Sequence, residues 1–556
     1  MAGAGVEEKK FNLLYEPWIC VFKSDGMQTE ISLLEVLRQA DKIDRLAGEL
    51  PTQDVAILRL LLAVLYGALV DDRVRTAKDA FQLWKQLWDA KAIPMDKVEP
   101  YLKQYEDRFW LFHPQTPFYQ VAEYSKAQAL YRKEHEITGS GEEKRKPVAK
   151  LVGDLSQSAN KVSPRLFPGR TGVKQSELNY GEAARWLLHL NGFDDNAAKK
   201  PTPKVRGYLG QLGMIYAKGH NLFETLLLNF VLLDEHNKVV EDSRPDSKAY
   251  WEKPVCTTVE NLIVQPAAIK DLYTLQSRRI LLHHNESGKV DGYQLTMGDY
   301  FDPDLGMLQE PMTVWFRNRK TGAFQPKTHN PVKQVWREFN SLVSTNVDEN
   351  NRDSGIVWWL RRLEEKGILP LKTLNICTVG LYYEFKSTLW MITDVVNDSL
   401  QLNSQLLAKL NENWIAEITE ALARTDKAVA ALAALARNVS RASTHRKQDN
   451  DSSFEKEASR KARADCYNVL DNMFREWLRN IDPETDSIRS KIEEWQDIVR
   501  TEVQAEGKLL ARHCSDTALI GFISVSKESK GTVIEKRENL FTAYTWFEIA
   551  LKKIFE

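Results

Sequence analysis

The sequence predicts an α+β protein, with a mixed α/β N-terminal domain at residues 1–398 and an all-α C-terminal four-helix bundle at residues 399–556. Three observations support this prediction. The 556 residues are too many for a single hydrophobic core. Residues 138–175 and 192–213 are rich in proline, glycine and basic residues, which predicts long irregular loops. After residue 400 the only proline is Pro483, and apolar residues recur at helical spacing.

The N-terminal domain is expected to combine a long apolar helix with a small sheet. Apolar residues at positions i, i+3 and i+4 predict a helix over Asp54–Leu87. Its most apolar part, Val55–Val70, contains Arg59 and is too short to span a bilayer, so we expect it to be buried. Aromatic and β-branched runs predict the sheet. The other expected elements are strands at Phe11–Leu14, Trp18–Phe22, Leu262–Val264, Arg279–His283 and Met312–Phe316, and helices at Leu33–Gln39 and Tyr180–Leu190.

The C-terminal region is expected to form the bundle because stretches rich in Ala, Leu, Glu and Lys are joined by short polar links. The expected helices are Ser404–Ala423, Asp426–Ser440, Phe454–Arg479, Ile488–Leu510 and Leu540–Ile554.

Charge is segregated along the chain. Residues 155–223 hold ten Lys and Arg against four acids. Residues 311–337 hold six and residues 427–448 hold five, with no acid in either stretch. The net charge is −1, so the rest of the chain is strongly acidic. Such segregation is typical of a protein that binds a polyanion, and three solvated surfaces are the alternative.

Composition and motifs argue against catalysis. The five cysteines lie far apart and form no CxxC pair, which argues against a cysteine zinc site and fits the reducing cytoplasm. No phosphate-binding loop, nucleophile elbow or zincin helix is present, and His283 and His284 would point to opposite faces of a strand. We therefore expect neither enzymatic activity nor a cofactor or metal. A metal nuclease with dispersed carboxylates stays open. The N-terminus lacks the apolar core of a signal peptide, so we expect a cytoplasmic protein without a membrane partner.

Several motifs together resemble the CasA family, the large subunit of the type I-E CRISPR Cascade surveillance complex. The resemblance covers essentially the whole chain and rests on the order and spacing of short segments. These segments are Phe11–Ile19 (FNLLYEPWI), Pro117–Gln120 (PFYQ), Lys218–Gly219, Trp251–Pro254 (WEKP), Asp271–Arg279 (DLYTLQSRR) and Glu310–Thr313 (EPMT).

The resemblance implies a subunit that is not an enzyme and recognises DNA. Members of the family read a protospacer-adjacent motif (PAM) in duplex DNA, start strand opening and help recruit a helicase-nuclease. Guide pairing supplies the sequence specificity. The implied partners are the guide RNA, the other Cascade subunits, the target duplex, the displaced single strand and the helicase-nuclease.

The resemblance also places two contacts near the PAM. The first is a loop against the guide handle, for which the implied residues are Arg165, Leu166, Phe167 and Arg170. Its arginines suit phosphates and its phenylalanine suits stacking, whereas a loop that plugs the core is the alternative. The second is a minor-groove contact at Ala197, Ala198, Lys199, Lys200 and Gln294. The family has glycines where this chain has the alanines, so the PAM sequence stays open, and Gln294 is alternatively an ordinary strand residue.

Two further contacts are implied for the opened duplex. A wedge hairpin that separates the first target pair corresponds to Glu384, Phe385 and Lys386, and a core role for Phe385 is the alternative. The residues expected to contact the DNA backbone are Arg317, Arg319 and Lys320, with Arg317 and Arg319 on one strand face, and Arg437, Arg441, Arg446 and Lys447 on a helical stripe. Inert solvation is the alternative for the stripe. At the level of function, the alternatives are a metal-dependent nuclease acting alone and an RNA-binding scaffold.

Overall fold

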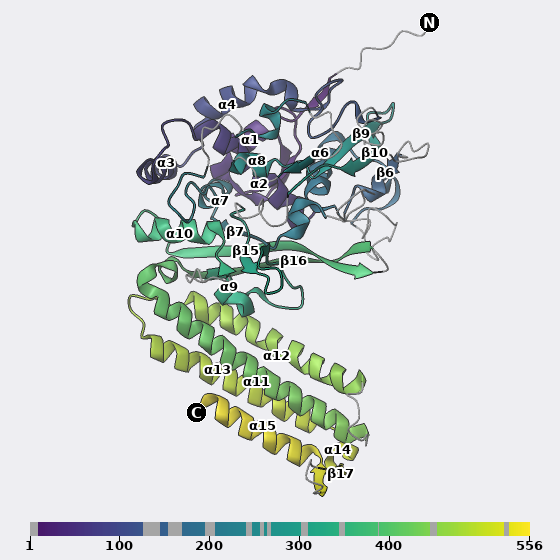
Figure 1. Cartoon of the computed structure of the whole chain (residues 1–556), viewed down its shortest axis with the longest axis vertical. Helices are drawn as coiled ribbons and strands as arrows, with labels where there is room; N and C mark the ends of the chain where they lie inside the picture. Colours follow the sequence, from purple (N-terminus) through teal and green to yellow (C-terminus); the bar gives the residue numbers. More distant parts are fainter. Residues whose placement is uncertain are drawn as a thin grey trace. The chain divides into compact units, whose positions relative to one another are not determined.

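The chain divides into two compact units in the computed structural model (Figure 1). Unit 1 comprises Met1–Lys333, Ser344–Pro370 and Leu374–Ser399, and unit 2 comprises Gln334–Val343, Leu371–Thr373 and Leu400–Glu556. The main division therefore lies between residues 399 and 400. Two short segments that were expected in the N-terminal domain, Gln334–Val343 and Leu371–Thr373, belong to unit 2. The structure describes residues 9–125, 145–153, 169–194, 206–240, 247–255, 261–263, 268–301, 310–343, 351–386, 389–444, 453–527 and 533–556.

Helix α2 (Pro51–Leu69) forms the centre of unit 1. Proline at its first turn suits a helix start, and almost every later side chain is buried. The helix is long and apolar enough to cross a membrane, but 83% of its most apolar window is buried inside the protein, as expected for a core helix. The helices packed against it are α4 (Met95–Gln104), α6 (Tyr180–Phe193), α7 (Leu222–Leu228) and α8 (Ile269–Tyr273).

The expected helix over Asp54–Leu87 is wrong as a single element. It ends at Leu69, and a new helix, α3 (Ala77–Ala90), begins after a polar turn. Thr76 caps α3 by accepting a hydrogen bond from the Asp79 backbone N–H, and the Asp79 side chain accepts in return from the Thr76 backbone. This capping box stops the apolar periodicity from continuing as one helix. Among the described residues, unit 1 also contains α1 (Leu33–Arg38) and α10 (Gly355–Glu365).

The expected small sheet is instead several separate small sheets. The strands expected at Leu262–Val264, Arg279–His283 and Met312–Phe316 correspond to β8, β9 and β12, which pair in three different sheets. The sheets, in strand order, are β1 (Lys10–Asn12) with β5 (Trp110–Phe112); β3 (Gln28–Ile31), β2 (Ile19–Lys23), β4 (Ile43–Leu46); β6 (Lys146–Pro147), β10 (Val290–Met297), β9 (Arg278–His284); β11 (Asp299–Phe301) with β8 (Asn261–Ile263); β13 (Phe324–Pro326), β12 (Trp315–Arg317), β14 (Asn351–Arg352); and β16 (Leu389–Asn403), β15 (Thr373–Lys386), β7 (Met214–Lys218).

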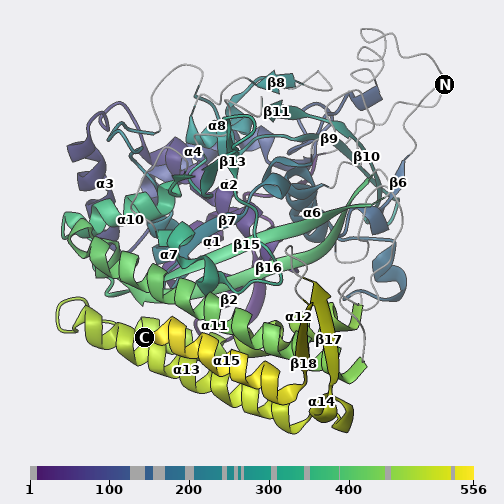
Figure 2. The ribbon, with the colours of Figure 1, turned by 60° about the horizontal axis from the view of Figure 1, so that its bottom comes forward.

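Unit 2 is a helical bundle, which confirms the α+β class. Helix α11 (Glu412–Thr444) packs against α12 (Ser453–Arg479), α13 (Ile488–Arg512) and α15 (Leu540–Phe555), as Figure 2 shows. A short helix, α14 (Asp516–Ile520), and a hairpin of β17 (Phe522–Lys527) and β18 (Val533–Glu538) lie between α13 and α15.

The two helices expected over Ser404–Ala423 and Asp426–Ser440 are joined in one helix, α11, which begins only at Glu412, after two 3-10 turns (Ser404–Leu407 and Lys409–Asn411). The polar Thr425 does not interrupt it, because its hydroxyl donates to the Ala421 carbonyl (2.9 Å) one turn earlier. The same hydroxyl accepts from the Trp495 indole (3.1 Å) on α13. A polar residue inside a helix can therefore serve packing between helices and need not mark a helix end.

Two short elements from the middle of the chain complete unit 2. A 3-10 turn (Val335–Glu338) and α9 (Phe339–Val343) belong to it. Trp336 is 1% exposed, stacks on Phe474 with ring centroids 4.8 Å apart, and meets Trp495 edge-on. The aromatic core of the bundle thus depends on a tryptophan contributed by a segment far earlier in the sequence.

Candidate nucleic-acid interface

Helix α6 supports the ends of both irregular segments that the sequence analysis singled out. It begins at the Asn179 cap and is buried along almost its whole length. Gly153, just before residues 154–168, lies so close to α6 that a Cβ there would stand 3.1 Å from the His189 ring and 3.3 Å from Trp186. Arg170, just after the same residues, contacts Glu182 in the first turn of α6.

Arg170 is a buried ion-pair residue, not the exposed phosphate clamp that we expected. Its Nη2 lies 2.6 Å from Glu49 Oε2, and its Nη1 lies 3.1 Å from Glu182 Oε1. A guanidinium held by two carboxylates has its donors engaged within the chain. The structure thus favours a structural role for Arg170. Arg165, Leu166 and Phe167 lie outside the described residues.

The ends of residues 195–205 are joined by backbone and side-chain contacts. The Gly207 N–H donates to the Asp194 carbonyl (2.8 Å), so the chain returns to the place where it left. The Asp194 carboxylate lies 2.5 Å from Arg278 Nε, and both side chains are almost fully buried, at 0% and 1% exposed. The expected minor-groove residues Ala197, Ala198, Lys199 and Lys200 lie outside the described residues. Their role stays a prediction.

Gln294 lies on the β9–β10 hairpin, whose first residue is Arg278. It is opposite Leu281 in the register, half-buried, and its Oε1 accepts a hydrogen bond from His283 Nε2 (3.0 Å). Burial lowers the pKa of His283, although the hydrogen bond to Gln294 opposes this, so a neutral ring donates that bond. Gln294 is therefore oriented by a neighbour on the adjacent strand, and contact with DNA stays a prediction.

The β15–β16 hairpin carries the expected wedge. Strand β7 pairs with β15 from Asn375 to Val379, so residues 380–386 of β15 extend past the described pairing with β7. Glu384 is half-buried within this part, and Phe385 and Lys386 are its last two residues, with side chains outside the described set. The Tyr383 hydroxyl donates to the Phe193 carbonyl at the end of α6 (2.7 Å). We call Phe193, Asp194, Arg206 and Gly207, which flank residues 195–205, the base of these residues. The hydrogen bond of Tyr383 to Phe193 thus attaches the hairpin to this base.

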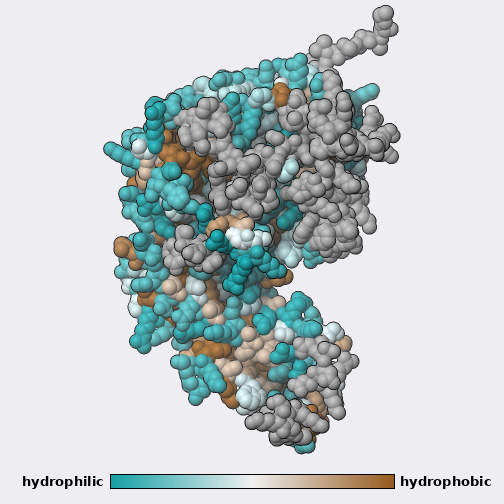
Figure 3. Space-filling view, in the orientation of Figure 1, coloured by the Kyte–Doolittle hydropathy of each residue, from teal (hydrophilic) through white to brown (hydrophobic). Residues whose placement is uncertain are grey.

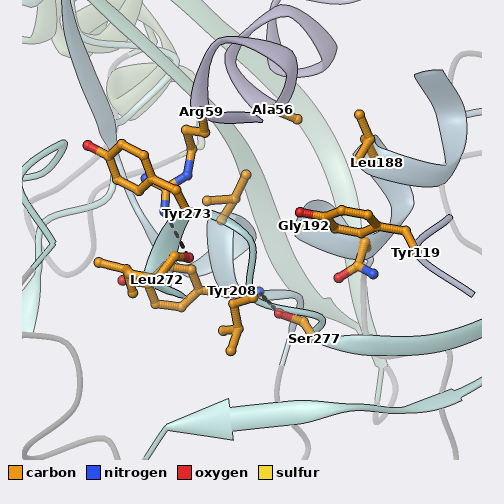
Figure 4. A pocket seen from close by; sticks show the side chains of 12 residues that line it. Ala56, Arg59, Tyr119, Leu188, Gly192, Tyr208, Leu272, Tyr273 and Ser277 are labelled. Atoms are coloured by element: carbon orange, nitrogen blue, oxygen red, sulfur yellow. Dashed lines mark hydrogen bonds between the residues drawn. The ribbon is translucent and has the colours of Figure 1, made fainter. Parts of the chain in front are cut away.

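A buried cluster beside these ends holds the surrounding elements together. Arg59 on α2 makes a bidentate pair with Glu310 (2.7 and 2.9 Å), and Tyr208 donates to the same carboxylate (3.0 Å). Burial raises the pKa of Tyr208 well above its usual value, so its hydroxyl stays protonated and donates. The adjacent cavity in Figure 4 has a volume of about 30 Å³, enough for water but not for a nucleotide.

The three residues of unit 1 that were expected to contact the DNA backbone, Arg317, Arg319 and Lys320, are exposed, but not in the expected arrangement. Arg317 lies at the end of β12 and its Nε donates to the Gly322 carbonyl (2.8 Å). Arg319 and Lys320 lie in the turn that follows, so Arg317 and Arg319 do not share a strand face. The strand ends there because Gly322 adopts φ +73° in a tight turn. All three side chains lie on the exposed turn of this hairpin.

The expected basic stripe on the bundle is partly wrong. Arg441 is 17% exposed and its Nη2 lies 3.0 Å from Glu455 on α12, which is 3% exposed. Arg437 is half-buried, with its Nε enclosed by the protein. Arg441 thus joins α11 to α12, and neither arginine belongs to a fully solvated stripe. Arg446 and Lys447 lie outside the described residues.

Sequence reasoning missed an exposed basic row on α12. Lys456, Arg460 and Arg463 follow at spacings of four and three, which places them on one helical face, and all three are exposed. A count of charge along the sequence did not reveal this row, because acidic residues alternate with the basic ones and keep the local net charge low. One of these acids, Glu457, pairs with Arg460. Helical spacing was the signal that could have found them. The face of the molecule in Figure 3 is mainly hydrophilic, with smaller hydrophobic areas.

Among the described residues there is no group of three or more His, Cys, Asp and Glu that could hold a metal ion. His283 and His284 lie on β9 next to Gln294 and Phe112 respectively. The Asp194 carboxylate is paired with Arg278.

Comparison with known proteins decides the family. The model for the family described as CRISPR-associated protein Cse1 matches residues 12–505, which is most of the chain. The chain belongs to the Cse1 family. The resemblance to CasA is confirmed, since the curated relative is called CRISPR-associated protein CasA/Cse1. That relative, from Thermus thermophilus, is 28% identical to this Cse1 family member over 351 residues, and the match spans 60% of each chain.

Solved structures share the fold over nearly the full length. Cse1 from Thermobifida fusca is 28% identical to this Cse1 family member, with a TM-score of 0.80 and 98% of each chain covered. A chain from a structure described as a CRISPR RNA-guided surveillance complex has a TM-score of 0.68 and covers 99% of this chain and 100% of its own. Its identity is 14%, so that likeness concerns the fold alone.

Proposed function

We propose that the chain is the large subunit of a CRISPR RNA-guided surveillance complex, in which it recognises the PAM in duplex DNA and starts strand opening. One observation carries the proposal. The ends of residues 195–205, the β9–β10 hairpin with Gln294, and the β15–β16 hairpin meet at Phe193 and Asp194. Family resemblance assigns each of these three parts to the duplex, and the likeness to a Cse1 structure supports the family on which that assignment rests.

The chemistry of these parts suits the proposed role. A glutamine can donate to the acceptors on the base edges of the minor groove, and lysines bind phosphates or enter that groove. A projecting hairpin can separate a base pair if its contacts offset an unstacking cost of a few kcal/mol. The exposed Arg317, Arg319 and Lys320 would add backbone contacts that do not depend on sequence.

The proposal includes further partners. The subunit would dock on the guide RNA handle and on the other subunits of the complex, hold the displaced strand and help recruit a helicase-nuclease. It would act in the cytoplasm and would not cleave nucleic acid itself. The name of the family, CRISPR-associated protein Cse1, supports membership of a CRISPR complex, and the fold shared with a chain from a surveillance complex agrees with it.

Binding of the guide-loaded complex, assembled with and without this chain, tests the proposal. The target is a duplex library randomised at the positions that flank the guide-matched sequence. We expect selection at a few flanking base pairs only when the chain is present. Added affinity without selection would contradict PAM reading, and no added affinity would contradict the subunit role.

Two controls separate the alternative functions. Cleavage of DNA by the purified chain with Mg²⁺ or Mn²⁺ would support a nuclease with dispersed carboxylates. Tight binding of guide-like RNA by the chain alone, without any effect on duplex binding, would support an RNA-binding scaffold.

A further inference from the structure

The cavity in Figure 4 is bounded by separate segments of unit 1. Its lining includes Arg59 from α2, Asn191 from α6 and Tyr119 from the chain that follows β5. The cavity has a volume of about 30 Å³. A single water needs roughly 10–15 Å³, so one or two waters fit in this space.

Tyr119 is directed into the cavity by an unusual backbone conformation. Its φ is +53°, in the left-handed region that a tyrosine seldom adopts. The residue is buried, and Figure 4 shows its ring extending toward the other lining side chains. Burial raises the pKa of Tyr119, so the hydroxyl keeps its proton and can donate a hydrogen bond. Among the described residues this hydroxyl has no hydrogen-bond partner. An unfavourable backbone conformation thus places a polar donor in a buried space.

Two other buried polar side chains border the same cavity. Ser277 Oγ accepts a hydrogen bond from the Tyr208 N–H (3.1 Å), which leaves the Ser277 hydroxyl proton for a second bond. The Asn191 amide is oriented because its Nδ2 donates to the Arg278 carbonyl (3.4 Å). Asn191 Oδ1 has no partner within the described part of the chain. The cavity is therefore bordered by two hydroxyls and one amide whose hydrogen-bonding capacity is not used up.

The chemistry of the lining favours water over an anion. Arg59 borders the cavity, but both of its terminal nitrogens donate to the Glu310 carboxylate (2.7 and 2.9 Å), which neutralises the guanidinium. A cavity lined only by hydrocarbon stays dry. A polar cavity of this size instead takes up water, which typically makes about three hydrogen bonds and relieves the cost of burying polar groups without partners.

We propose that the cavity is a binding site for an ordered water that accepts a hydrogen bond from the Tyr119 hydroxyl and bonds to Ser277 and Asn191. Such a water joins three parts of unit 1 that have no direct hydrogen bond through these side chains: the segment Pro117–Gln120, the last turns of α6 and the residue before β9. The inference does not depend on the proposed function.

The test uses the full chain and compares two tyrosines that line the same cavity. Tyr119→Phe removes the hydroxyl that would bind the water and keeps the ring. Tyr273→Phe is the matched control, because the Tyr273 hydroxyl is buried without a partner among the described residues, and Figure 4 shows it directed away from Tyr119. Urea unfolding followed by tryptophan fluorescence gives the unfolding equilibrium constant of each protein. A high-resolution crystal structure of the wild-type chain shows whether the site contains water.

We expect Tyr119→Phe to raise the unfolding equilibrium constant roughly fivefold, as the loss of one hydrogen bond does, and Tyr273→Phe to leave it unchanged or lower it. The crystal structure should show a water about 2.7–2.8 Å from the Tyr119 hydroxyl oxygen. Density without a water in the cavity would overturn the inference. An unchanged or more stable Tyr119→Phe would overturn it too, because the hydroxyl would then have no partner to lose. Equal destabilisation by both substitutions would overturn it in favour of a general effect of removing a buried hydroxyl.

Discussion

The buried Arg278–Asp194 pair gives a quantitative test of the base of the candidate interface. The perturbation is Arg278→Met, which removes the guanidinium and leaves the Asp194 carboxylate in the same place. The two side chains are 1% and 0% exposed, so solvent does not screen their interaction. Breaking a buried pair by removing one partner costs about 3–5 kcal/mol, and we expect Arg278→Met to lower the free energy of unfolding of unit 1 by this amount.

The double variant Arg278→Met/Asp194→Leu decides whether that cost arises from the uncompensated charge. Replacing both members of a buried pair with apolar side chains is often neutral, so the double variant should recover most of the lost stability. Urea unfolding followed by tryptophan fluorescence measures wild type, the single variants Arg278→Met and Asp194→Leu, and the double variant, and hydrogen exchange of peptides that contain residues 188–194 locates the loss. Arg489→Met, in an exposed pair on α13, is the control and should leave the midpoint unchanged.

The refuting results are distinct. If Arg278→Met unfolds at the same urea concentration as wild type, the pair does not stabilise the folded base. If the two substitutions are additive, the cost arises from lost packing and not from an isolated buried charge.

Three other predictions concern the bundle, a buried acid and the exposed turn. Trp336→Ala should destabilise unit 2 by about 3–5 kcal/mol in urea unfolding, because the indole fills the aromatic core, and an unchanged midpoint would contradict that placement. Burial raises the pKa of Asp54 from 3.8 to about 7, so the folded protein retains a proton that the unfolded chain releases. Wild type should therefore lose stability relative to Asp54→Asn as pH rises from about 4 to about 7, and parallel stability profiles would refute this. Reversing the charge of Arg317, Arg319 and Lys320 should weaken duplex binding and reduce its salt dependence without changing the unfolding midpoint, and unchanged affinity would exclude the turn from the interface.

Helix existence in the bundle was predictable, whereas helix continuity was not. The expected Phe454–Arg479 and Ile488–Leu510 agree closely with α12 and α13, because their apolar spacing persists and no proline or glycine stops it early. The division at Thr425 failed because its hydroxyl bonds to the backbone of the same helix. The β17–β18 hairpin was missed because four of the six residues of β18 (VIEKRE) are charged, so only β17 carries an apolar strand pattern.

Basic residues were the least predictable part of the candidate site. Arg170 and Arg441 were expected to meet phosphates, but Arg170 is held by Glu49, 121 residues away, and Arg441 by Glu455 on the neighbouring helix. A count of charges along the chain cannot distinguish arginines that are held in ion pairs from arginines that face solvent. The contact between Tyr383 and residues on both sides of 195–205 was equally invisible, since about 180 residues separate Tyr383 from Arg206 and Phe193.

The sequence by itself determined the α+β class, the change to a helical C-terminal region near residue 400, and the resemblance that the family match confirms. Periodicity and motif order are properties of the sequence alone, so they can be recognised without knowing which parts of the chain pack together. Only the tertiary structure decided that Trp336 belongs to the bundle core, that Arg278 closes the base of residues 195–205, and which arginines remain exposed. Burial and ion pairing depend on which side chains meet in space, and those partners lie tens to hundreds of residues apart.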